Sequence, residues 1–382
     1  MDYKRMPIEI ESPEQLGYDK IRNNLSESSY TDTLLRDLPG RDDLRDLALC
    51  YGSHQGHEGL RGLIAKEHAT LKADHMPLEA DHVLLTMGAA GALFILATSL
   101  LEKGDELIVV HPNYATNIET PRAIGAALRT IGLRFEEGFA PDISRIEKAI
   151  TPKTRYISVT HPHNPTGVCL TNDQLQQLAD IAENKGIYVL VDETYRDMVF
   201  GEQLPPAATW SPRIISISSL SKTYGLPGLR VGWIICRDAG LMETFLAAKE
   251  QIHICGPVLE EELAYRYLQH RHAHLTRIRE DIRGKFRIMK DWMLRGEEWE
   301  WIEPQGGCVC FPRLRRPHDI DVEVFYRVLL DRYGTYVGPG HWFDMPDHYM
   351  RIGFGWPSAG SLEEGLSAMS KAVKDAWKNP GR

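Results

Sequence analysis

The chain has 382 residues, 43% of them apolar and 25% charged, a composition that is ordinary for a globular protein with a large core. Its 44 Lys and Arg against 53 Asp and Glu give a net charge of −9, which argues against binding nucleic acid by neutralising phosphates. The six cysteines have no zinc or redox spacing, so we expect reduced thiols and no metal site.

The N-terminal stretch has no apolar run typical of a signal peptide, and the longest apolar run, 91–101, is too short to span a membrane. We therefore expect a soluble, cytoplasmic protein. Helical patterns over 57–68, 89–101 and 172–186 alternate with short apolar runs of strand character. These runs are 83–87, 107–110, 156–160, 187–191, 214–218 and 233–236. Strands that alternate with helices predict a mostly parallel sheet covered on both faces.

After about residue 240 the pattern changes. A charged helical stretch over 259–295 precedes extended runs, a helix near 321–332, short strands at 335–338 and 349–354, and a helix from 361. This order predicts a smaller α+β domain. We expect an N-terminal segment (1–45) that joins this domain, a large domain (46–275) and a small domain (276–382).

The strongest chemical signal lies in the loop 219–232, which reads Ser-Leu-Ser-Lys-Thr-Tyr-Gly-Leu-Pro-Gly-Leu-Arg-Val-Gly. This pattern closely resembles the segment that binds pyridoxal 5′-phosphate (PLP) in class I and II aminotransferases, which have the PLP-dependent transferase fold type I. The resemblance implies an α/β fold with a seven-stranded sheet. It also implies that Lys222 forms a Schiff base (internal aldimine) with PLP, and that Ser219 and Arg230 hold the phosphate, with Ser221 beside them.

Two further segments fit the same family in the same order. Asn164-Pro165-Thr166-Gly167 follows the run 156–160, and Asp192 and Tyr195 follow the run 187–191. A carboxylate at the end of a buried strand is costly unless it is paired. The resemblance implies that Asp192 binds the protonated pyridine nitrogen, while Asn164 and Tyr195 contact the phenolic oxygen. It also implies a cis bond before Pro165.

Small residues open the helix that follows the run 83–87. Free N–H groups at such a helix start favour an anion, so we expect Gly88, Ala89 and Ala90 at the phosphate. By resemblance, Tyr114 stacks on the PLP ring and Tyr51 reaches the phosphate of the neighbouring subunit. A shared active site of this kind implies a homodimer.

Arg351 lies in Tyr-Met-Arg-Ile-Gly-Phe, which resembles the family's substrate-binding segment. Its planar guanidinium suits the α-carboxylate of an amino acid. The resemblance implies an aminotransferase that moves an amino group between an L-amino acid and a 2-keto acid through the Lys222 aldimine. The catalytic residues would be Lys222, Asp192 and Tyr195, with Arg351 and Asn164 at the substrate. We expect no nucleic-acid or membrane partner.

The stretch 24–29, Asn-Leu-Ser-Glu-Ser-Ser, departs from the glycine-containing substrate loop of many relatives. It is similar to PLP enzymes that act on arginine-like substrates, including capreomycidine synthases and arginine oxidases. On this interpretation Glu27 meets a cationic substrate side chain; equally, it is a solvated carboxylate that caps a turn. The alternative function is therefore a PLP-dependent oxidase, hydroxylase or cyclase that acts on arginine or an arginine-like amino acid.

Two other classes of protein are disfavoured. A dinucleotide-binding dehydrogenase needs G-x-G-x-x-G after its first strand, whereas 88–91 reads G-A-A-G. A transcription regulator with an aminotransferase-like domain places a DNA-binding module ahead of it. The 50 residues before Tyr51 contain no helix-turn-helix pattern.

Overall fold

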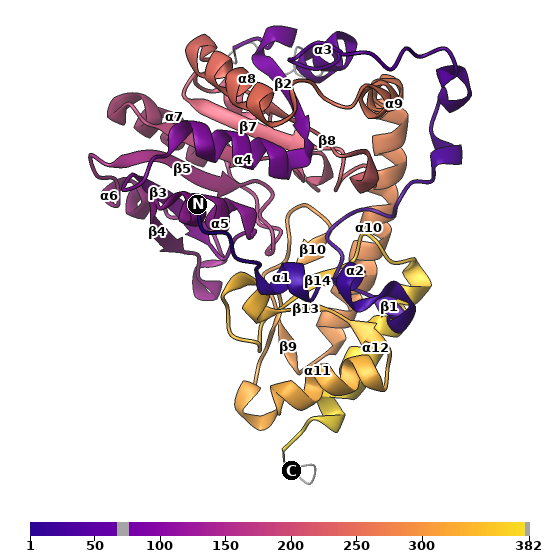
Figure 1. The fold of residues 1–382 in the computed structure, drawn as a ribbon. Coiled ribbons are helices and arrows are strands. Elements are labelled where there is room, and N and C mark those ends of the chain that lie inside the picture. Colours follow the sequence, from indigo (N-terminus) through magenta and orange to yellow (C-terminus); the bar gives the residue numbers. More distant parts are fainter. Residues whose placement is uncertain (67–75, 379–382) are drawn as a thin grey trace.

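A computed structural model describes residues 1–66 and 76–378 (Figure 1). Within these ranges a seven-stranded sheet has the order β2-β8-β7-β6-β5-β3-β4. The strands are β2 (Val83–Met87), β3 (Glu106–His111), β4 (Ala127–Gly132), β5 (Thr154–Thr160), β6 (Tyr188–Asp192), β7 (Ile214–Ser219) and β8 (Val231–Ile235). Neighbouring strands are parallel except for β8, which is antiparallel to both β2 and β7. The predicted α/β fold with a mostly parallel sheet is confirmed.

Strand β4 is not predicted by the sequence pattern, and its position explains why. It lies at the edge of the sheet, paired only with β3 among the described residues, and most of its side chains are exposed or half-buried. Its sequence, Ala-Leu-Arg-Thr-Ile-Gly, therefore lacks the apolar run that marks a strand buried on both faces.

Alternate side chains of each inner strand enter different cores, because successive residues of a strand point to opposite faces. On one face, Leu84, Leu107 and Leu190 pack with α4 (Gly88–Leu100), α5 (Thr116–Ile124) and α8 (Ala239–His253). On the other face, Ile108 and Val189 pack with α6 (Ile143–Lys148) and α7 (Asn172–Lys185). Helices thus cover the sheet on both sides (Figure 1).

The stretch predicted to be helical over 259–295 is helical in the structure, divided into two helices. The chain forms α9 (Val258–Gln269) and α10 (Arg271–Arg295), which meet at His270. The predicted helix over 57–68 corresponds to α3 (Glu58–Lys66), and its last two residues lie outside the described part of the chain.

The C-terminal third forms a separate layer around helices α11 (Val322–Asp331) and α12 (Ala359–Asp375) (Figure 1). A three-stranded sheet in this layer consists of β10 (Val309–Cys310), β14 (Met350–Gly353) and β13 (Gly338–Pro339), in that order. Strand β9 (Trp299–Glu300) pairs with β11 (Arg313–Leu314). Strand β1 (Asn23–Asn24) pairs with β12 (Thr335–Tyr336). Because β1 pairs with β12, the N-terminal segment packs on this C-terminal layer. Helix α10 spans the predicted boundary at 275/276, so the domain limits stay a prediction.

The described residues include no helix that is long and apolar enough to cross a membrane. Within the same ranges, no group of three or more His, Cys, Asp or Glu side chains is placed to hold a metal ion. All six cysteines are free thiols, and Cys308 and Cys310 are buried.

Candidate active site

Ten of the predicted site residues line one cavity at the carboxyl ends of the parallel strands. They are Ala89, Ala90, Tyr114, Asn164, Asp192, Tyr195, Ser219, Ser221, Lys222 and Arg230. Leu93, Thr160, Thr194 and Pro227 complete the wall. Open α/β sheets bind ligands at this edge, because the loops that follow the strands converge there.

One end of the cavity offers hydrogen-bond donors to an anion. The first amides of α4 follow Met87, whose side chain has no oxygen to cap them. Gly88 has φ +68°, and a side chain there would collide with the guanidinium of Arg230. Arg230 also donates to Ser221 Oγ at 3.3 Å. Helix amides, hydroxyls and a guanidinium together suit a phosphate group.

A buried carboxylate stands at another wall of the cavity. Asp192 is 6% exposed, and its Oδ1 accepts hydrogen bonds from Thr194 N at 3.1 Å and Thr194 Oγ1 at 2.6 Å. Burial raises the pKa of Asp192, while the bonds from Thr194 and Asn117 oppose that rise. A carboxylate in such a place is stabilised by a cationic partner, which a protonated ring nitrogen would supply.

Sequence reasoning missed Asn117, which lies behind Asp192 on α5. Its Oδ1 accepts from Ser158 Oγ at 3.1 Å, and its Nδ2 donates to Asn113 Oδ1 at 3.2 Å. All three side chains are buried. No sequence motif signals them, because the contacts join α5 to β5 only in the folded chain.

Lys222 faces the cavity from the loop after β7. Its Nζ donates a hydrogen bond to Ser28 Oγ at 3.1 Å. Burial lowers the pKa of the Lys222 amine; the nearby Glu27 carboxylate opposes this effect and the Arg351 guanidinium adds to it. A lysine with a lowered pKa is more often neutral at a given pH, and the neutral amine is the nucleophile.

Arg351 reaches the site from β14. Nη1 donates to Asn164 Oδ1 at 3.2 Å, and Nη2 donates to Ser26 O at 2.8 Å. The guanidinium carbon lies 5.1 Å from the ring centre of Phe343. Nε is buried and has no hydrogen-bond partner among the residues that the structure describes. A buried guanidinium with an unused donor beside Asn164 fits an anionic ligand.

Asn164 lines the cavity and precedes a proline. The bond between Asn164 and Pro165 is cis, so the predicted cis bond is confirmed; the bonds before Pro112 and Pro162 are also cis. Asn164 is 5% exposed. Its side-chain oxygen accepts a hydrogen bond from Arg351, which lies 187 residues away in the sequence.

Glu27 lies near the cavity but not in its wall. Its Oε1 accepts from Tyr18 Oη at 3.1 Å, and its side chain is half-buried. Burial raises the pKa of Glu27, an effect that the charges of Lys222 and Arg351 oppose. The Glu27 carboxylate therefore lies within the electrostatic influence of Lys222 and Arg351. This position favours the interpretation that Glu27 meets a ligand, although the role itself stays a prediction.

Tyr51 is 80% exposed and does not line the cavity of its own chain within the described residues. Leu49 is equally exposed, and Ile252 and Ile254 at the end of α8 are 49% and 44% exposed. The predicted contact of Tyr51 with a neighbouring subunit stays a prediction.

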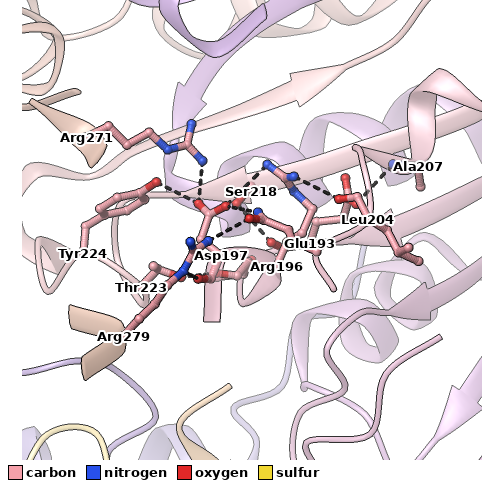
Figure 2. Close-up of polar contacts among 12 residues, drawn as sticks. Glu193, Arg196, Asp197, Leu204, Ala207, Ser218, Thr223, Tyr224, Arg271 and Arg279 are labelled. Atoms are coloured by element: carbon pink, nitrogen blue, oxygen red, sulfur yellow. Dashed lines mark hydrogen bonds and ion pairs between the residues drawn. The ribbon is translucent and has the colours of Figure 1, made fainter. Parts of the chain in front are cut away.

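A buried polar cluster supports the Lys222 loop from behind (Figure 2). Asp197 Oδ2 accepts from Tyr224 Oη and from Arg271 Nη2, each at 2.7 Å. The Asp197 carbonyl accepts from Arg279 Nε at 2.7 Å. Tyr224 follows Lys222 by two residues, while Arg271 and Arg279 belong to α10. The cluster therefore ties the Lys222 loop to the helix that reaches the C-terminal layer.

We expect Asp197→Asn to destabilise the protein by about 3–5 kcal/mol, because it removes the carboxylate of a buried, hydrogen-bonded ion pair with Arg271. Urea unfolding followed by circular dichroism measures this loss. Asp81→Asn is the matched control, since Asp81 pairs with Arg61 but is 85% exposed. We expect less than about 1 kcal/mol there. Equal losses in both variants would contradict the assigned role of the cluster.

His341 connects the N-terminal segment, through Glu11, to the part of the C-terminal layer that precedes Arg351. Its Nε2 lies 2.8 Å from Glu11 Oε2, and its Nδ1 lies 2.8 Å from Asp347 Oδ1. Glu11 Oε2 also accepts from Trp342 Nε1 at 2.8 Å. Burial lowers the pKa of His341, but the hydrogen bonds to Glu11 and Asp347 outweigh it and raise the pKa above its ordinary value.

A raised pKa in the folded state stabilises the protein at low pH, and this stability is lost as pH rises through the folded pKa. We therefore expect Glu11→Gln to lower Tm by about 1–2 °C at pH 5.5 and by almost nothing at pH 9.5. The effect is small because both side chains are 40% exposed. Differential scanning fluorimetry at the two pH values checks this, and an equal decrease at both would refute it.

The residues present fit PLP, because the cavity pairs a donor set for phosphate with a buried carboxylate and a lysine of lowered pKa. Fold and site together define a PLP-dependent enzyme of fold type I. The sequence profile of the family described as "Aminotransferase class I and II" matches residues 41–368. The chain belongs to this family, and it is a PLP-dependent aminotransferase of class I/II.

Known proteins similar to this chain include a synthase as well as aminotransferases. Capreomycidine synthase of Streptomyces vinaceus is 33% identical over 367 residues, which cover 93% of this chain and 91% of that protein. An arginine–pyruvate transaminase of Pseudomonas aeruginosa is 28% identical over 335 residues, covering 86% and 80%. The crystal structure of a PLP-dependent aminotransferase from Streptococcus suis 89-1591 superposes with a TM-score of 0.88 at 26% identity, covering 99% of this chain and 100% of that chain.

Proposed function

We propose that this aminotransferase moves the amino group of an L-amino acid to a 2-keto acid, with Lys222 as the residue that bears PLP. The observation that carries the proposal is the half-buried Lys222, whose side chain lies in the wall of the cavity that also contains Asp192. PLP supplies an electron sink for the bonds at the substrate Cα. Burial favours the neutral Lys222 amine, which can attack a carbonyl carbon and accept a proton at Nζ.

The proposed cofactor contacts follow from the two ends of the cavity. The amides of Gly88, Ala89 and Ala90 would hold the phosphate together with Ser219, Ser221 and Arg230. Asp192 would pair with the ring nitrogen, and Asn164 and Tyr195 would contact the phenolic oxygen; the Tyr195 hydroxyl would then turn its proton from Ser28 O, to which it donates in this structure, to that oxygen. Tyr114, which lines the same cavity, would lie against the ring. The support for these contacts is chemical. The hydrogen-bond donors lie together and suit the phosphate anion, and the buried Asp192 carboxylate suits the protonated ring nitrogen.

Arg351 would bind the α-carboxylate of the substrate. Its fixed bonds to Asn164 Oδ1 and Ser26 O orient the guanidinium, and its Nε remains without a partner among the described residues. A pre-oriented guanidinium fixes the substrate at two points and so sets which Cα bond faces the electron sink.

The test is a substrate panel with the purified protein. L-arginine and neutral L-amino acids are each incubated with pyruvate or 2-oxoglutarate, and the keto-acid product and oxygen uptake are measured together. Turnover that requires the keto-acid acceptor supports amino transfer. Oxygen consumption without any need for an acceptor would sink the proposal.

A second candidate is a PLP-dependent oxidation, hydroxylation or cyclisation of arginine or an arginine-like amino acid. The similarity to capreomycidine synthase favours it. Both candidate reactions would use Glu27 to recognise a cationic side chain. The products of the same panel, analysed by mass spectrometry, separate the two reactions.

We expect Glu27→Gln to lower kcat/KM for L-arginine about tenfold, because one charge-assisted contact is lost, and to leave kcat/KM for a neutral amino acid nearly unchanged. Glu14→Gln is the control. The Glu14 carboxylate is a second negative charge close enough to affect Glu27, but its side chain is exposed. Steady-state kinetics with L-arginine and with the neutral amino acid measures whether kcat/KM falls for arginine alone. A similar loss for arginine in the two variants would mean that Glu27 has no specific role.

We also propose a homodimer with shared active sites. The exposed Tyr51 and Leu49, together with the exposed Ile252 and Ile254, support it, because large apolar side chains favour burial against a partner. Light scattering after size-exclusion chromatography measures the mass directly. A location in the cytoplasm likewise stays a prediction.

A further inference from the structure

Residues 25–33, which we call the strap, cross from the C-terminal layer to the Lys222 loop. At the first end, Gly353 N donates to Leu25 O at 2.7 Å. At the second end, Tyr30 N donates to Lys222 O at 2.8 Å. Backbone bonds therefore fix the strap on both sides of the site, and the side chains between them have defined positions.

Ser28 lies between these two anchors and is 5% exposed. Its Oγ accepts from Lys222 Nζ at 3.1 Å, and its carbonyl accepts from Tyr195 Oη at 2.8 Å. The two contacts use different atoms, so a substitution at Ser28 removes the first and leaves the second. The hydroxyl makes no other hydrogen bond within residues 1–66 and 76–378.

The hydroxyl contact is significant because Lys222 is half-buried in the wall of the cavity, where fewer water molecules can solvate its amine. A buried ammonium is stabilised by each oxygen that accepts one of its protons. Burial lowers the pKa of Lys222, and the hydroxyl acts against burial by favouring the charged form. Removing the hydroxyl therefore leaves the amine neutral over a wider range of pH.

We propose that Ser28 is a positioning residue, whose hydroxyl holds Lys222 Nζ at the cavity while this amine is not bonded to the cofactor. The proposal deepens the proposed function and rests on it, since the contact matters for turnover only if Lys222 bears PLP. Because Ser28 belongs to the strap, the same contact links the position of the strap to whether the Lys222 amine is free or bonded to the cofactor.

The first measurement uses the full-length protein after its cofactor has been dialysed away. The rate at which acetic anhydride labels Lys222 is followed by peptide mass spectrometry between pH 6 and 9.5. We expect Ser28→Ala to raise the labelling rate at pH 7 roughly fivefold, because loss of one hydrogen bond to a charged group favours the neutral amine. Ser28→Thr keeps the hydroxyl and should restore the wild-type rate.

Ser29→Ala is the matched control, because Ser29 is 4% exposed and no hydrogen bond joins it to Lys222 in the described chain. Ser28→Cys is the second variant, since it keeps the volume and offers only a weak acceptor. Labelling of Ser28→Ala and Ser28→Cys at the wild-type rate would overturn the proposal. So would an equal change in Ser29→Ala.

The second measurement uses the protein with its cofactor. The rate of the half-reaction with an amino acid is recorded against pH. In Ser28→Ala we expect the acidic side of this pH–rate profile, where the rate rises with pH, to move to lower pH. In Ser29→Ala we expect no such change. Borohydride reduction followed by peptide mapping tests separately whether Lys222 bears PLP. A negative mapping result refutes the proposed function without affecting the labelling result, so the two failures are distinguishable.

Discussion

Replacing Lys222 by alanine is expected to abolish the visible absorption of lysine-bound PLP and to lower kcat by about 10³-fold or more. The amine at this position supplies both the nucleophile and the proton acceptor of the proposed reaction, and no other part of the side chain can replace it. Absorption spectra and single-turnover kinetics of the purified variant measure the two losses. Lys222→Arg should behave in the same way, because a guanidinium keeps the charge but is not a useful nucleophile.

Lys249 provides a demanding control for this experiment. It is fully buried on α8, and burial lowers its pKa to about 8, although the nearby Glu261 opposes the shift. It does not line the cavity in the described chain. We expect Lys249→Met to keep the visible band. If the band were lost there and kept in Lys222→Ala, the assignment of the PLP-bearing lysine would be wrong.

Arg351→Gln is expected to lower kcat/KM by about 10²–10³-fold while the visible band persists. A buried charged contact of this kind is worth about 2–5 kcal/mol when one partner is truncated. The cofactor band should remain because Arg351 lies outside the cavity wall, on β14. Steady-state kinetics and absorption spectra of the same preparation separate substrate binding from cofactor binding.

Arg351→Lys is the matched variant, because it keeps the charge and loses the two-point fork. We expect a loss of kcat/KM between those of wild type and Arg351→Gln. If both variants lost thermal stability and kept kcat/KM, Arg351 would be structural: its bonds to Asn164 and Ser26 would hold the strap rather than orient a substrate.

Much of the site could be predicted because its residues follow strands directly. Asp192 ends β6, and the loop with Lys222 follows β7, so the position of each is set by local pattern. Parallel strands bring their carboxyl ends to one edge of the sheet, and the two residues must therefore lie close together. The same reasoning failed for β4 and for the junction of α9 and α10. An edge strand carries little apolar signal, and a break between two charged helices leaves the helical pattern nearly unchanged.

The amino-acid sequence by itself predicted the fold class from local periodicity, and the cofactor from a dense motif that resembles a known family; the PLP-bearing role of Lys222, inferred from the same motif, stays a prediction. Only the tertiary structure placed Ser28 against Lys222, 194 residues away, and Arg351 against Asn164, 187 residues away. Such contacts depend on how the N-terminal strap and β14 pack beside the loops that follow β7 and β5. No local pattern carries that information, since the crossing is set by packing between distant segments whose side chains meet only when the core has formed.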